Sequence, residues 1–195
     1  MGTLMKKIQD QSTYWERTPP TIGPSARASA VVDRVIQEVD LTADLRAPWP
    51  QQFRTLMTRI IEALRAHPWT VALLPTRSLS RGWLRPTEHA LEILIRAGFS
   101  NKGATHIARH AHFTAIGLVS GELGYPAGPP GRTDGQARQR DAVTLLRALP
   151  SEDFPNVIGA AHWLTACDEP EAYYRVGLNI LIAGIEAMAG QHEAL

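Results

Sequence analysis

The residues whose types and spacing best suit chemistry are three histidines in the stretch 100–123. His106 and His110 are one helical turn apart, so their imidazoles share a helix face, and two imidazoles at that spacing can hold a metal ion. His112 lies on a different face and cannot complete such a site on a regular helix. No cysteine cluster or glutamate-flanked zinc motif accompanies the pair. Histidines on a pocket wall or on the surface are the competing interpretation, and we expect no metal or other cofactor.

Candidate nucleophiles have no more support. Ser120 stands in GLVSG, which lacks the spacing of a nucleophile elbow, and no strand is expected before it. The single cysteine, Cys167, ends an apolar stretch and suits a small buried side chain. Glu169 and Glu171 are explained as acids at a helix start. Because the sequence also lacks a phosphate-binding glycine loop and a dinucleotide fingerprint, we expect no catalytic residue and no enzyme activity.

Composition favours one soluble domain. The chain has 195 residues, with 20 Lys and Arg against 19 Asp and Glu, so a strongly basic nucleic-acid surface is not indicated. One cysteine rules out an internal disulfide and fits a reducing compartment. A signal peptide and an apolar run long enough for a membrane span are both absent from the sequence. We therefore expect a cytoplasmic protein that does not associate with a membrane.

Helical periodicity recurs along the chain, and no stretch alternates convincingly with period two, so the expected fold class is all-α. Residues 1–24 contain prolines and a glycine that interrupt a helix and predict an irregular arm. A loop is expected over 125–135 and a short apolar turn over 69–74. Helices are expected over 25–39, 51–66, 86–97, 100–123, 141–149, 154–167 and 169–188.

Several of these boundaries rest on individual residues. Ser100 is placed to cap the longest helix, and Gly98 to end the helix before it. Pro86 suits the first position of a helix, where its missing N–H is harmless. Asp168 and Glu171 have the spacing of a capping box at the start of the last helix.

The last helix has an unusual pattern, because residues 176–185 are apolar almost all round apart from Asn179. Such a helix is covered on more than one face. In a chain of this size, a second copy of the protein is the simplest cover. The sequence therefore predicts a homodimer.

Three stretches resemble the C-terminal ligand-binding and dimerisation domain of tetracycline-repressor-like (TetR-like) transcriptional regulators. The first is WPQQFRTLMTRIIEALRAHPW at 49–69, and the second joins AGFS at 97–100 to HFT at 112–114, Gly117 and Glu122. The third and most specific is DEPEAYYRVGL at 168–178, followed by IAGIE at 182–186. The resemblance implies a helical bundle over 25–190 that dimerises through a four-helix interface made by helices 100–123 and 169–188 of both copies.

The resemblance also implies two sets of site residues. The effector pocket would be lined by Phe53, Leu56, Ile60, Trp69, Leu74, Leu91, Ile107, Ala111 and His112. The dimer interface would contain Phe113, Gly117, Ser120, Gly121, Gly177, Leu181, Gly184 and Met188. Tetracycline repressors place polar or metal-binding residues where this chain has Leu56 and Leu74, so the expected effector is a small, mainly apolar molecule. Judged from their residue types alone, the pocket residues equally suit a hydrophobic core.

The family's DNA-binding module would need about 40 residues for its three helices, more than 1–24 can supply. DNA binding would then require a reader module from a partner or a longer chain. Two alternatives stay open beside a regulator core. One is a stand-alone small-molecule binder, or a protein that forms mixed dimers with intact regulators and blocks them. The other is a metal-dependent enzyme that uses His106 and His110.

Overall fold

The computed structural model describes residues 24–42, 44–71, 81–125 and 134–189, and these residues contain helices and no strand. This confirms the all-α prediction. Two predictions lie outside the described residues: the irregular arm, except for its last residue Pro24, and the pocket residue Leu74. The elements in chain order are α2 (Pro24–Gln37), α3 (Trp49–Ala66), the 3-10 helix η1 (Pro68–Thr70), α4 (Arg81–Arg96), α5 (Asn101–Gly124), α6 (Gly135–Arg147), α7 (Pro155–Gly159) and α8 (Pro170–Ala189).

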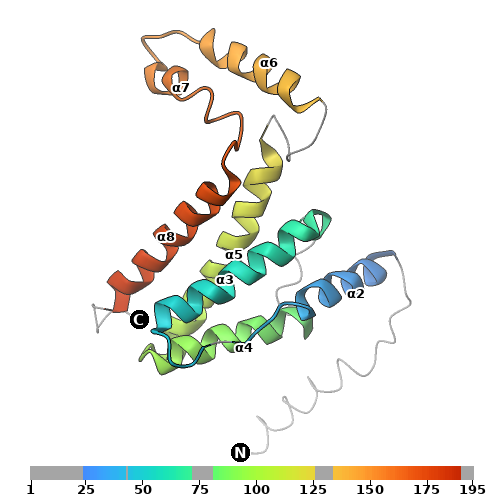
Figure 1. Ribbon diagram of the computed structural model, residues 1–195, viewed down its shortest axis with the longest axis vertical. Coiled ribbons are helices and arrows are strands. Elements are labelled where there is room, and N and C mark those ends of the chain that lie inside the picture. The colour runs from blue at the N-terminus through green and yellow to red at the C-terminus, as the bar shows by residue number, and fades with distance from the viewer. Residues whose placement is uncertain (1–23, 43, 72–80, 126–133, 190–195) are drawn as a thin grey trace, which may run out of the picture.

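Helix α3 lies at the centre of the bundle and contacts α2, α4, α5 and α8 (Figure 1). Its apolar residues recur every three or four positions, so they form one stripe that turns towards these neighbours. The stripe is almost completely buried and is the centre of the hydrophobic core. It consists of Phe53, Leu56, Met57, Ile60, Ile61 and Leu64.

Helix α5 begins where the sequence predicts. The Ser100 hydroxyl accepts a hydrogen bond from the Gly103 backbone N–H at 3.0 Å, which caps the helix. Gly98 has φ +98°, the left-handed conformation that ends α4. The buried face of α5 is rich in alanine, including Ala104, Ala108, Ala111 and Ala115, and such small side chains let α3 and α4 pack close to it.

Helix α4 begins earlier than predicted, at Arg81, which places Pro86 inside the helix. Pro86 removes one backbone hydrogen bond, to the carbonyl of Gly82. The preceding turn is nevertheless helical because Gly82 and Trp83 are buried in it and pack into the bundle. Tertiary packing therefore outweighs the local preference of proline for a helix start.

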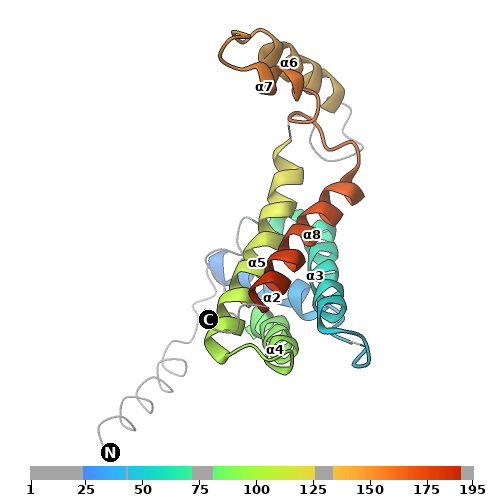
Figure 2. The ribbon, with the colours of Figure 1, turned by 90° about the vertical axis from the view of Figure 1, so that its left-hand side faces the viewer.

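Helices α6 and α7 form an arm that stands away from the other helices, at the top of Figures 1 and 2, and they pack mainly on each other. Helix α6 begins at Gly135, earlier than predicted, whereas the helix predicted over 154–167 is reduced to α7 and a series of turns. A short helix needs an apolar surface to pack on. The arm offers little of it, because Leu145, Trp163 and Leu164 are all exposed.

Helix α8 begins at Pro170, so Asp168 precedes the helix and the predicted capping box is not formed. The Asp168 carboxylate instead lies 2.6 Å from His162 Nε2, at the base of the arm. Glu171 accepts a hydrogen bond from Arg65 on α3. Among the helices within the described ranges, none is both long and apolar enough to span a lipid bilayer.

Candidate functional site

The imidazole of His112 is a buried polar group on α5. His112 is only 5% exposed, and its Nε2 atom has no hydrogen-bond partner among the described residues. The indole of Trp83, on α4, packs against it edge to face, with ring centroids 4.7 Å apart. Because burial penalises the charged form, the pKa of His112 is lowered to about 4, and the ring is neutral at physiological pH.

Five of the predicted pocket residues lie together in the hydrophobic core around this helix. They come from α3 and α5, and all are almost completely buried: Phe53, Leu56, Ile60, Ile107 and Ala111. The structure therefore brings together the residues predicted from these two helices, in a closely packed cluster. His112 is buried on the same helix, one residue after Ala111.

The placement of two other predicted pocket residues is different. Trp69 follows α3 in the short helix η1 and is 49% exposed, so it lies outside the buried cluster, and its role in the pocket stays a prediction. Its position after the helix-ending His67-Pro68 pair turns it outward, a direction that residue type alone does not reveal. Leu91 packs on the edge of the core and also lines a surface groove of about 510 Å³. The other residues of that groove are Glu88, Glu92, Ile95, Arg96, Asn101 and Thr105.

An ion pair between the partly buried Arg65 and the buried Glu122 joins α3 to α5, and Tyr174 connects α8 to it. Arg65 donates two hydrogen bonds to the Glu122 carboxylate, from Nε and Nη2, both at 3.1 Å. The Tyr174 hydroxyl donates a further hydrogen bond to Glu122, and the Arg65 guanidinium lies 4.6 Å from the centre of the Tyr174 ring. Burial and the bond to Glu122 together raise the pKa of Tyr174 well above its ordinary value. Both Glu122 oxygens are therefore paired, which fixes the three helices relative to one another.

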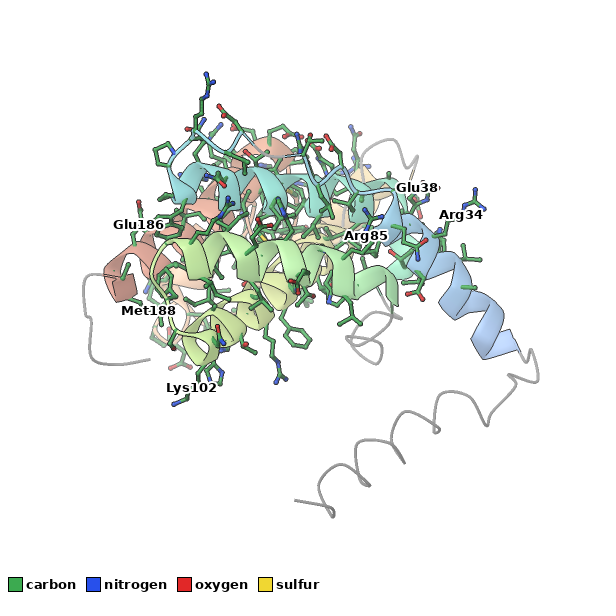
Figure 3. All side chains as sticks on the ribbon, turned by 90° about the horizontal axis from the view of Figure 1, so that it is seen from below. Arg34, Glu38, Arg85, Lys102, Glu186 and Met188 are labelled. Atoms are coloured by element: carbon green, nitrogen blue, oxygen red, sulfur yellow. The ribbon has the colours of Figure 1, made fainter. Side chains whose placement is uncertain are left out.

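Helices α5 and α8 lie side by side (Figures 1 and 2). The exposed apolar side chains on these two helices form what we call their apolar face. On α5, Phe113 is exposed, and Gly117 and Ser120 follow it at helical spacing. On α8, Ile180 is 70% exposed and is flanked one turn away by the exposed Val176. Met188, near the end of α8 opposite the arm, is also exposed (Figure 3). Exposed apolar side chains that gather on two neighbouring helices are typical of a protein interface.

The four glycines predicted for the interface fall into two pairs. A Cβ on Gly117 or Gly184 would meet nothing within 4 Å, so both glycines face open space in the single chain. A Cβ on Gly177 would lie 2.6 Å from the Leu118 side chain, and one on Gly121 would meet the Tyr173 hydroxyl. The second pair therefore serves close packing of α5 on α8 within one chain. Leu181 is half-buried against the core.

His106 and His110 lie on α5 and are both exposed. Within the described ranges, no three His, Cys, Asp or Glu side chains come together in a group that could hold a metal ion. The structure thus supplies no further ligand for this pair.

Three residues that the structure places at the candidate sites are not among the site residues predicted from the sequence. Trp83 was not singled out, although its apolar bulk beside a glycine is a signal of close packing. Val176 and Ile180 carry the exposed face of α8, and the all-round apolar pattern of 176–185 already pointed to that face. Helical spacing from Gly184 would have found both, since they precede it by one and two turns.

Residues 43–189 match the family described as the tetracyclin repressor-like, C-terminal domain. The Streptomyces coelicolor TetR family protein ActR in complex with actinorhodin has a similar fold, with a TM-score of 0.72 and 18% identity over 94% of this chain and 88% of ActR. Apo ActR from the same organism gives a TM-score of 0.70 and 20% identity, over 87% and 77% of the two chains.

The S. coelicolor transcriptional regulator SCO7222, a TetR protein, gives a TM-score of 0.61 and 16% identity, over 92% of this chain and 82% of its own. These likenesses concern the fold. No curated protein matches the sequence.

Proposed function

Because this chain belongs to the tetracycline repressor-like C-terminal-domain family, we propose that it is the effector-binding and dimerisation core of a transcriptional regulator. The observation that carries the proposal is the exposed apolar face of α5 and α8, on which Ile180 is the most exposed side chain. A single chain leaves this face in water. A second copy, applied by a two-fold axis, would cover it with the same surface.

In the proposed dimer, α5 and α8 of each copy form a four-helix interface. Gly117 and Gly184 face open space and would let the backbones of the two copies approach closely. Phe113, Val176 and Ile180 would provide the apolar area that drives association. The hydrogen bond from Tyr174 on α8 to Glu122 on α5 would help to hold the two helices in the relative orientation that this interface requires.

We further propose that the effector is a small, mainly apolar molecule bound within the bundle of α3, α4 and α5. The core side chains gathered there are apolar. His112 adds one buried polar group, a neutral imidazole whose Nε2 has no hydrogen-bond partner among the described residues. Likeness of fold to ActR, solved in complex with actinorhodin, supports a binding role for this bundle. Effector binding would shift the balance between dimer arrangements, and DNA contacts would come from a reader module of a partner or a longer chain.

The dimer is tested by analytical ultracentrifugation of the whole chain and two variants. Ile180→Glu places a charge on the proposed interface, where it would be desolvated, and we expect a monomer. Leu145→Glu is a matched control, since Leu145 on α6 is 71% exposed against 70% for Ile180. We expect Leu145→Glu to stay dimeric. A monomeric parent protein, or equal effects of the two variants, would overturn the proposed interface.

A further inference from the structure

We propose that Nε2 of His112 is the polar anchor of the effector, and that the effector is a neutral molecule with a hydroxyl or carbonyl group on an apolar body. This inference rests on the proposed function, because it names the chemical class that the same bundle would bind. It stands on one geometric fact. An imidazole nitrogen lies inside the core with no hydrogen-bond partner among the described residues.

A buried ring nitrogen without a partner is unfavourable, because it has given up its bonds to water and gained nothing in return. An apolar side chain at this position would avoid that penalty. The other polar groups near the core are paired: Thr70 donates to the His67 carbonyl, and Tyr174 donates to Glu122. Among the buried side-chain polar atoms that the structure describes, Nε2 of His112 is thus the exception, and a hydrogen bond from an incoming ligand would satisfy it.

The surroundings of His112 select an uncharged partner. One turn away on α5 lie Ala108 and Ile116, both buried in the hydrophobic core, and Trp83 packs on the ring from α4. A carboxylate brought into this environment would lose its hydration, and the imidazole that it would meet is neutral because it is buried. A hydroxyl or a carbonyl carries no such penalty. Either one can pair with Nε2, which accepts in one tautomer and donates in the other.

The nitrogen is sealed from solvent, so a ligand reaches it only when a covering side chain moves. Trp83 is the ring packed on His112, and it lies in the first turn of α4, next to Gly82. The neighbouring Gly82 packs against the Asp33 backbone of α2, so a displaced Trp83 indole would act on the contact between α4 and α2. In this way, the anchor would connect effector binding to the helix at the N-terminal end of the described chain.

Three probes of similar size test the proposal in the full chain: naphthalene, 2-naphthol and 2-naphthoate. Binding is measured by isothermal titration calorimetry at neutral pH, where only 2-naphthoate is charged. We expect the parent protein to bind 2-naphthol about tenfold more tightly than naphthalene, the effect of one buried hydrogen bond. We expect no measurable binding of 2-naphthoate.

His112→Phe should bind naphthalene and 2-naphthol alike, and His112→Gln, which keeps a hydrogen-bonding group, should restore part of the preference. His110→Phe is the matched control, because His110 lies on the same helix but is exposed. A readout independent of these variants is the ¹⁵N NMR signal of His112 Nε2 in histidine-labelled parent protein. It should shift with 2-naphthol and stay unchanged with naphthalene.

The outcomes separate the two levels of the proposal. Binding of none of the three probes to the parent protein would contradict the apolar effector site itself. Equal binding of 2-naphthol and naphthalene by the parent protein, or an unchanged preference in His112→Phe, would overturn only the anchor. Tight binding of 2-naphthoate would overturn the neutral class.

Discussion

The backbone of Asp33 in α2 passes so close to Gly82 in α4 that a Cβ placed on Gly82 would lie 2.5 Å from the Asp33 carbonyl oxygen. Only glycine allows this approach, because the obstructing atoms belong to backbone and cannot rotate away. Trp83, the next residue, packs on His112. The first turn of α4 therefore contacts α2 on one side and the candidate anchor on the other.

We predict that Gly82→Ala separates α2 from α4 and destabilises the protein. Forcing a methyl group into a packed contact with backbone costs about 1 to 3 kcal/mol. Gly159→Ala is the control, since a Cβ on Gly159 meets nothing within 4 Å. Urea unfolding followed by circular dichroism measures both variants. If Gly82→Ala were as stable as the parent protein, α2 could move away from α4 without any loss in the free energy of unfolding, and the prediction would be wrong.

A second prediction concerns pH. The folded pKa of His112, about 4, lies below its ordinary value of 6.5, so the unfolded chain binds more protons between these two values. Stability should therefore fall as the pH falls below about 6.5, and His112 should account for a loss of about 2 kcal/mol by about pH 5. Urea unfolding of the parent and His112→Gln across this range isolates the contribution. The two proteins should differ in slope, and parallel slopes would contradict the buried neutral imidazole.

A third prediction separates a buried charge from an exposed one. Glu122→Gln leaves Arg65 without its buried carboxylate, and we expect a loss of about 2 to 3 kcal/mol in the free energy of unfolding. Glu171→Gln removes an exposed carboxylate from the same arginine, and pairs of that kind contribute about 0 to 1 kcal/mol. Thermal unfolding distinguishes the two. If both variants lose the same stability, the buried pair does not hold α3 to α5 as described.

A fourth prediction concerns the glycines on the proposed interface. Gly184→Leu adds a side chain where the single chain has open space, so the fold should be kept and the dimer weakened. We expect the dissociation constant of the dimer, measured by sedimentation equilibrium, to rise at least tenfold, with unchanged helix content. Gly159→Leu, also in open space but on the arm, should leave the dimer unchanged. The opposite pattern would place the interface on the arm.

Much of the fold follows from local sequence. The apolar stripe of α3 has helical period, Ser100 caps α5 through a bond to a residue three positions away, and Gly98 adopts the left-handed conformation that ends α4. Each of these features depends on residues within one or two turns, so the sequence carries the whole signal. The family resemblance could also be recognised from sequence, because each of its motifs lies in one helix and the residues next to it.

Tertiary structure decided what depends on partners far along the chain. Pro86 stands inside α4 because α2 and the core hold the preceding turn, and the helix predicted over 154–167 is mostly turns because the arm offers it little to pack on. Glu171 bonds to Arg65 in place of forming a capping box, and Trp69 points outward.

The sequence likewise could not show that Nε2 of His112 is buried without a partner, because Trp83, which packs on this ring, comes from another helix, α4. Sequence spacing fixes which face of its own helix a side chain occupies. The neighbours that cover that face come from other helices, and only folding brings them together.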